Sequence, residues 1–206
     1  MAEPVVLRAA VRAVVPWRNG AGTTTVVAEG PPSSAGSSGP TWPEPTWREP
    51  TWREPTWRVS VATIARSAPF SEFAGVDRLL MPLSAAGLDL VVDGRRVHGE
   101  ALEVLAFAGE SAVAAVDVAA EGLDLNLMTR RGSAEGQLRT VEVPTVLELA
   151  PHEVVGAVVL SGEARLGNDV LGALDAFLVP GPATVAVAGS GVLAMARISG
   201  VADPGS

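Results

Sequence analysis

The sequence predicts an all-β protein, and three observations support this fold class. The 22 glycines and 16 prolines are spread along the chain and separate short apolar runs, as in β-sandwiches and barrels. The runs are rich in Val and Thr, which favour strands. In Trp57–Ala62, Trp57, Val59 and Val61 alternate with Arg58 and Ser60, which is the period of a strand. An Ala-rich segment such as 111–120 also fits a helix, but its valines and the neighbouring glycines favour a strand.

The expected strands are short, and each is bounded by residues that favour turns. Asp93-Gly94 follows one apolar run directly and precedes another, so it predicts a hairpin in which Gly94 takes a positive φ. In chain order the expected strands cover residues 5–15, 23–28, 57–65, 88–92, 102–107, 112–118, 123–129, 138–143, 154–160, 183–188 and 192–198.

A low-complexity insertion interrupts this pattern between the second and third expected strands. Residues 30–40 are rich in Pro, Ser and Gly, and residues 41–58 repeat with period five as TWPEP, TWREP, TWREP and TWR. Period five fits neither a helix nor a strand, and the recurring Pro favours extended polyproline geometry. Two interpretations stay open: a Trp-rich arm that recognises a partner protein, or a loop expansion that the surface tolerates.

Composition narrows the function classes. All 15 basic residues are Arg and face 23 acidic residues, for a net charge of −8, so the basic surface that nucleic acids require is not expected. The absence of Lys and Cys excludes Schiff-base chemistry, thiol nucleophiles and disulfides. The longest uncharged stretch, 176–196, contains two prolines, and the first residues do not resemble a signal peptide. We therefore expect a cytoplasmic protein that binds neither nucleic acid nor membrane.

Catalytic and metal motifs are weak. The two histidines, His98 and His152, are far apart in the sequence, and we expect no metal site, no cofactor and no catalytic residue. The chain has no Gly-x-Ser-x-Gly motif, and the glycines of residues 19–22 have no neighbouring Lys of the kind found in a phosphate loop.

Polar residues embedded in apolar strands are the stronger signal. Alternation places Asp124, Asn126 and Arg130 on one face of their strand, and Arg58 and Ser60 form a similar face on another. Guanidinium, amide and hydroxyl groups together suit a small carboxylate, which Arg can bind through two parallel hydrogen bonds. The alternative is that this face is solvated and that Asp124 and Arg130 form ion pairs on it. Spacing alone does not favour either interpretation over the other.

Four sequence blocks carry a family resemblance. Pro16–Thr24, Trp57–Ala62, Pro69–Arg78 and Asp124–Arg131 resemble, in this order, the signature blocks of the HutD/Ves family. Two departures, Ala21 and Ala74, stand where the family has Gly and Pro, and neither removes a polar side chain.

The resemblance implies a bicupin, with two cupin-type double-stranded β-barrels in one chain. The first would cover residues 1–142, with the insertion at about 30–56, and a smaller barrel would cover 143–206. It also implies a small-molecule-binding modulator of histidine utilisation, with no established enzymatic activity. Its expected ligand is a small anionic metabolite such as urocanate or a formylglutamate-type intermediate. A second copy of the chain, in a homodimer, is a further candidate partner.

The residue pattern and the resemblance together define the expected ligand site. Arg58, Arg78 and Arg130 are the expected carboxylate partners, and Asn19, Ser60 and Asn126 are expected to orient the ligand. The full set of expected site residues is Trp17, Asn19, Trp57, Arg58, Ser60, Arg78, Asp124, Asn126 and Arg130, with Trp17 and Trp57 lining the pocket or packing beneath it.

Two other functions stay open. One is a cupin-type hydrolase or isomerase, cofactor-free or weakly metal-assisted, with Asp124 or Asp77 as general base. The other is an interaction module that uses the Trp-Arg-Glu-Pro repeat, since Trp and Arg often dominate interface energies.

Overall fold

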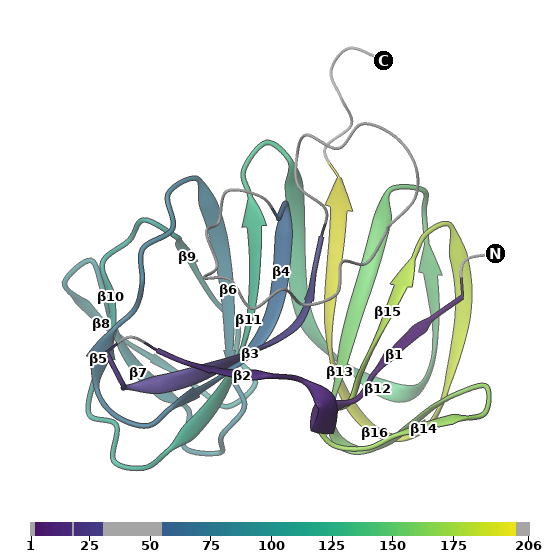
Figure 1. Cartoon of the computed structure of the whole chain (residues 1–206), viewed down its shortest axis with the longest axis horizontal. Coiled ribbons are helices and arrows are strands. Elements are labelled where there is room, and N and C mark those ends of the chain that lie inside the picture. The colour runs from purple at the N-terminus through teal and green to yellow at the C-terminus, as the bar shows by residue number, and fades with distance from the viewer. Residues whose placement is uncertain (1–2, 18, 31–54, 201–206) are drawn as a thin grey trace.

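The computed structural model describes residues 3–17, 19–30 and 55–200, and strands dominate them. Two halves lie side by side, with the N-terminal sheets on the left of Figure 1 and the C-terminal sheet on the right. The strands of the described residues form three hydrogen-bonded sheets. Among the same residues, the one helical segment is a 3-10 turn, Ala9–Val11. The all-β prediction is confirmed.

Two antiparallel sheets build the N-terminal half. The larger sheet has the order β2 (Val14–Pro16), β3 (Gly22–Glu29), β4 (Trp57–Ile64), β11 (Gly122–Arg130), β6 (Val76–Pro82), β9 (Leu105–Ala108). The smaller sheet has the order β5 (Ala68–Pro69), β10 (Val113–Ala115), β7 (Leu88–Val92), β8 (Arg95–Gly99). The predicted hairpin joins β7 to β8, and Asp93 and Gly94 have φ values of 48° and 80° there.

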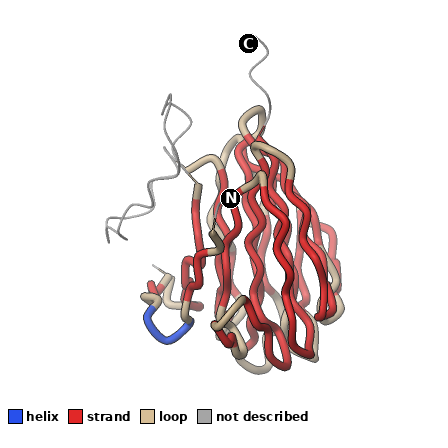
Figure 2. The backbone as a smooth tube through the Cα atoms, turned by 90° about the vertical axis from the view of Figure 1, so that its right-hand side faces the viewer, coloured by secondary structure: helices blue, strands red, loops and turns tan. Residues whose placement is uncertain are grey.

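The third sheet forms the C-terminal half, whose long strands face the viewer in Figure 2. Its order is β1 (Val5–Leu7), β15 (Ala176–Pro180), β13 (Glu153–Leu166), β16 (Ala183–Gly200), β12 (Ala134–Leu149), and β14 (Asp169–Leu171) pairs with β13. Although β1 comes from the beginning of the chain, it pairs with β15 at the outer side of this half (Figure 1).

Several expected strand limits are wrong. The single strand expected over 5–15 is divided into β1, the 3-10 turn and β2, because the chain leaves the C-terminal sheet there and joins the N-terminal one. The two strands expected at 183–188 and 192–198 are one strand, β16, whose ladder with β13 continues through Gly189 and Gly191. The expected strand ranges omit β5, β6, β8, β14 and β15.

Three apolar clusters hold the described residues together. One cluster joins the two halves, with Val59 and Leu127 of the large N-terminal sheet packed against residues such as Leu138 and Val158. A second, which includes Phe177, lies within the C-terminal half. The third joins the two N-terminal sheets, and its buried members are Ile64, Leu90, Val113 and Ala115. The large N-terminal sheet is therefore packed on both faces.

The bicupin expectation is met only in part. In the described residues no sheet closes on itself, so two closed barrels are not confirmed. The expected boundary between residues 142 and 143 falls inside β12 and stays a prediction. Within these same residues, no helix has the length and apolar character needed to cross a membrane.

Candidate functional site

The polar residues come together because their strands are neighbours in the large N-terminal sheet. Asn126 of β11 lies opposite Ser60 of β4, and Met128 lies opposite both Arg58 of β4 and Arg78 of β6. Cross-strand partners point to the same side of a sheet. The register therefore gathers on one face the groups that alternation had placed on separate strands.

This face points into the N-terminal half. Ile64, further along the same face of β4, belongs to the cluster that packs on the smaller sheet. Asp124, Asn126 and Arg78 are only 1%, 5% and 7% exposed. The alternative of a solvated polar face is therefore wrong for these residues, and burial makes their hydrogen bonding energetically important.

Three of these side chains form a hydrogen-bonded row, which we call the polar row: Arg78, Asn126 and Asp124. Arg78 donates from Nη2 to Oδ1 of Asn126 at 2.9 Å. Asn126 in turn donates from Nδ2 to Oδ1 of Asp124, also at 2.9 Å. The row thus connects a buried cation on β6 to a buried acid on β11.

Burial shifts the pKa of both ends of the polar row. The pKa of Asp124 is raised to about 7 because the carboxylate loses water, although Arg78, the Ala62 backbone and Asn126 oppose this rise. The pKa of Arg78 is lowered to about 10 by the same loss of water, partly offset by Asp124. Arg78 stays charged at neutral pH, whereas Asp124 exchanges its proton close to neutrality.

Three phenyl rings surround the Arg78 guanidinium, and we call them the phenyl cage: Phe70, Phe73 and Phe107. Their centroids lie 5.4, 5.8 and 5.1 Å from Arg78 Cζ, within cation–π range. Trp17 packs edge-on against Phe70 at 5.9 Å. The cage shields the guanidinium from water, and Nε of Arg78 is buried without a hydrogen-bond partner among the described residues.

Arg58 lies on the same face but has an acidic neighbour. Its Nε and Nη2 approach Glu29 Oε2 at 2.9 and 2.8 Å, and the two residues are cross-strand partners on β3 and β4. Ser60 is buried one pleat further along β4. Glu29 therefore offsets the charge of Arg58.

Other predicted site residues lie at the margin of this face or away from it. Trp57 points to the opposite face, into the cluster between the two halves, so it packs beneath the polar face and does not line it. Arg130 lies at the end of β11, partly exposed. Trp17 adjoins the cage, and its Nε1 donates to Thr24 Oγ1 at 2.8 Å.

Asn19 lies in the loop before β3. Its Oδ1 accepts a hydrogen bond from the Ala21 amide at 3.0 Å, and its Nδ2 donates to the Pro69 carbonyl at 3.3 Å. The structure therefore places Asn19 where it shapes the loop and ties it to β5. A direct contact of Asn19 with a ligand stays a prediction.

Asp77, one of the two expected general bases, lies outside the site. It lies near the beginning of β6 and points to the face opposite the polar row, where Arg131 Nε approaches its Oδ1 at 3.1 Å. Its side chain is 58% exposed. An acid in this position lacks the buried surroundings that tune a catalytic carboxyl group.

Sequence reasoning missed Glu29 and the phenyl cage. Glu29 directly follows the Thr-rich run of residues 23–28, and an acid in this position is a signal for a cross-strand Arg partner. Phe70 and Phe73 lie in the Pro69–Arg78 block, but the family resemblance gives them no role. Phe107 is separated from that block in sequence and reaches Arg78 only through the pairing of β6 with β9.

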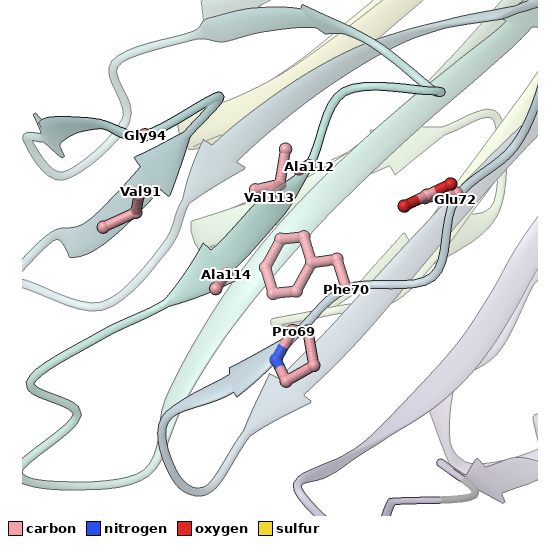
Figure 3. Close-up of a pocket in the computed structure, with 8 residues that line it drawn as sticks. All are labelled: Pro69, Phe70, Glu72, Val91, Gly94, Ala112, Val113 and Ala114. Carbon is pink, nitrogen blue, oxygen red and sulfur yellow. The ribbon is translucent and has the colours of Figure 1, made fainter.

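An open depression of about 300 Å³ adjoins this region on the smaller sheet. Its walls come from β5, β7, β10 and the residues after β5, and Phe70 lies at its centre in Figure 3. The lining is apolar apart from Glu72 and backbone groups. Phe70 thus contacts both this depression and Arg78.

Among the described residues, no group of three or more His, Cys, Asp and Glu side chains gathers in a way that could hold a metal ion. The period-five Trp repeat, apart from its last residues, falls in 31–54, outside the described part of the chain.

The fold and the site define a class: an all-β protein of three antiparallel sheets with a buried polar face in its N-terminal half. The HutD family model matches residues 9–195, and the chain belongs to the HutD family.

The chain is similar to several known proteins in sequence or in fold. A protein Ves from Citrobacter koseri is 30% identical over 159 residues, which are 75% of this chain and 72% of that protein. HutD from Pseudomonas fluorescens SBW25, solved in a formate condition, has a TM-score of 0.78 at 25% identity, covering 97% of this chain and 100% of its own. A conserved protein of unknown function from Pseudomonas aeruginosa PAO1 has a TM-score of 0.73 at 22% identity, with coverage of 97% and 100%.

Proposed function

We propose that the polar row binds a small carboxylate metabolite and that the protein acts as a ligand-responsive modulator. The observation that carries this proposal is Arg78, a buried guanidinium whose Nε has no hydrogen-bond partner among the described residues. Buried donors in native proteins nearly always have partners, so such a group marks a place where a ligand can complete the hydrogen bonding.

The surroundings of Arg78 suit an anion. Asn126 accepts from one nitrogen of the guanidinium, which fixes its plane, and the phenyl cage lowers the local dielectric. An Arg–carboxylate pair is stronger in such surroundings than in water. In this proposal Ser60, the cross-strand partner of Asn126 on β4, orients a second polar group of the ligand.

Family membership supports carboxylates of histidine breakdown as the ligands. We propose urocanate or a formylglutamate-type intermediate, both of which offer the carboxylate that Arg78 requires. The bound state would then report the level of the intermediate, and no chemical step on the ligand is needed.

Titration calorimetry with urocanate, N-formylglutamate and formate tests the proposal. Arg78→Met should weaken binding at least about thirtyfold, because losing one partner of a buried charge pair costs roughly 2–5 kcal/mol. Arg139→Met, which removes an exposed Arg of β12, is the matched control and should bind as the wild type does. No binding of any of the three compounds to the wild type, or equal binding to Arg78→Met, would contradict the proposal.

One observation favours the enzymatic alternative, a hydrolase or isomerase of the same carboxylates. Asp124 is buried, and its pKa of about 7 is that of an effective general base at neutral pH. Turnover of urocanate or N-formylglutamate, measured by chromatography, would support this function if Asp124→Asn abolished turnover and the exposed Asp77→Asn did not.

A further inference from the structure

We propose that the polar row takes up one proton together with the carboxylate ligand, and that Asp124 is the group that accepts it. The site would then bind the anion of an organic acid and a proton as a pair. This inference rests on the proposed function, because it concerns the same site, and it adds a dependence of binding on pH.

The geometry couples the two events. Arg78 is the cation at one end of the polar row, and Asp124 is the acid at the other, joined through the amide of Asn126. Asp124 is 1% exposed, so water does not solvate its carboxylate, and Arg78 is the cation that offsets its charge. A ligand carboxylate on Arg78 would share the cation that offsets Asp124.

The other charged groups on this face, Arg58 and Arg130, are paired with another residue or distant from Asp124. On β4, Arg58 is held by Glu29 of β3. On its own strand β11, Arg130 lies at the far end, three pleats away from Asp124. The smaller sheet presents the apolar side chains of Leu90, Val113 and Ala115 to this interior.

The proton balance of the coupled step is simple. In the free protein the Asp124 carboxyl is close to half ionised at neutral pH, since burial raises its pKa to about 7 against the opposing effect of Arg78. A second carboxylate on Arg78 places two negative charges near one cation, and like charges raise the pKa of the buried group further. Solvent supplies the proton, which binds an Asp124 oxygen, and no other bond is made or broken.

Calorimetry in two buffers of different ionisation enthalpy measures this uptake directly. Formate and N-formylglutamate are the first probes, because neither titrates between about pH 6 and pH 8. We expect uptake that approaches one proton per ligand near pH 8, and a dissociation constant about tenfold weaker at pH 8 than at pH 6, as linkage requires. For urocanate, whose imidazole titrates in this range, the contribution of Asp124 is the difference between the wild type and Asp124→Asn.

Variants identify the acceptor. Asp124→Asn should bind with little dependence on pH and without proton uptake, whereas Asp77→Asn, the same change at an exposed side chain of β6, should behave as the wild type. Binding to the wild type with heats that do not depend on the buffer overturns the inference and leaves the proposed function intact, and this readout needs no variant. Unchanged uptake in Asp124→Asn overturns the assignment to Asp124. No binding of any of the three carboxylates overturns the proposed function and the inference with it.

Discussion

At the scale of single residues, Asp124 is placed where it costs stability. Its ordinary pKa is 3.8 and its pKa in the folded protein is about 7, so the folded state holds the proton more tightly than the unfolded state does. Between these values the folded protein binds more protons, and its stability therefore falls as the pH rises through this window. A residue that lowers stability in its ionised form is more easily explained by function than by folding.

Asp124→Asn should remove this pH-dependent loss of stability. Relative to the wild type, the variant should gain on the order of 2 kcal/mol of unfolding free energy when the pH is raised from about 5 to about 8. The gain arises because Asn stays neutral, whereas Asp must ionise inside the protein. Denaturant unfolding at the two pH values measures it, with Asp77→Asn as the exposed control. A difference between variant and wild type that does not change with pH would show that the pKa of Asp124 is not raised by burial.

At the scale of elements, glycines let the long C-terminal strands β13 and β16 stay paired through an irregular stretch. Gly162, Gly189 and Gly191 have φ values of 72°, 115° and 148° next to the register shift of the two strands. A Cβ built on Gly162 would lie 2.0 Å from the Ser190 carbonyl oxygen, which is far below van der Waals contact. The strands approach here more closely than any side chain permits.

Gly162→Ala should therefore destabilise the protein more than the same change at an open glycine. Gly94 has a φ of 80° and nothing within 4 Å of a built Cβ, so Gly94→Ala measures the conformational strain alone. We expect about 1 kcal/mol for Gly94→Ala and at least about 2 kcal/mol more for Gly162→Ala. Equal losses in denaturant unfolding would mean that the two strands can separate at Gly162 without cost.

At the scale of the whole molecule, one apolar cluster joins the two halves and β1 ties the beginning of the chain to the C-terminal sheet. We propose that the halves correspond to the two cupin-type barrels that the family implies, although their sheets do not close. The described residues that flank the insertion are joined by a backbone hydrogen bond of 2.9 Å from the Gly30 amide to the Trp57 carbonyl, beside the paired strands β3 and β4.

Replacing residues 31–54 with a short Gly/Ser link should leave folding and carboxylate binding unchanged. The reason is that the pairing of β3 with β4 and the polar row lie within the retained residues. Thermal unfolding and calorimetry check the two properties. If folding and binding are unchanged but a protein pulled down by the full chain is no longer pulled down, the repeat acts as an interaction arm. Loss of cooperative unfolding would show that the insertion contributes to the core.

The amino-acid sequence was sufficient for the fold class, the turn at Asp93-Gly94, the family, and the polar residues that share a face within β4 and within β11. These features depend on local conformation, because side-chain alternation and turn preference act over a few neighbouring residues. Alternation says which residues share a face but not which face is buried, and so it left open whether Asp124 met water.

Tertiary structure decided the rest. It buried the polar face against the smaller sheet, brought Arg78 to Asn126 across 48 residues, surrounded Arg78 with the phenyl cage and turned Trp57 away from the site. Each of these contacts depends on strand pairing and sheet packing between segments that are distant in the chain. These contacts are stable only when all the sheets of the chain are packed together, so no local pattern in the sequence specifies them.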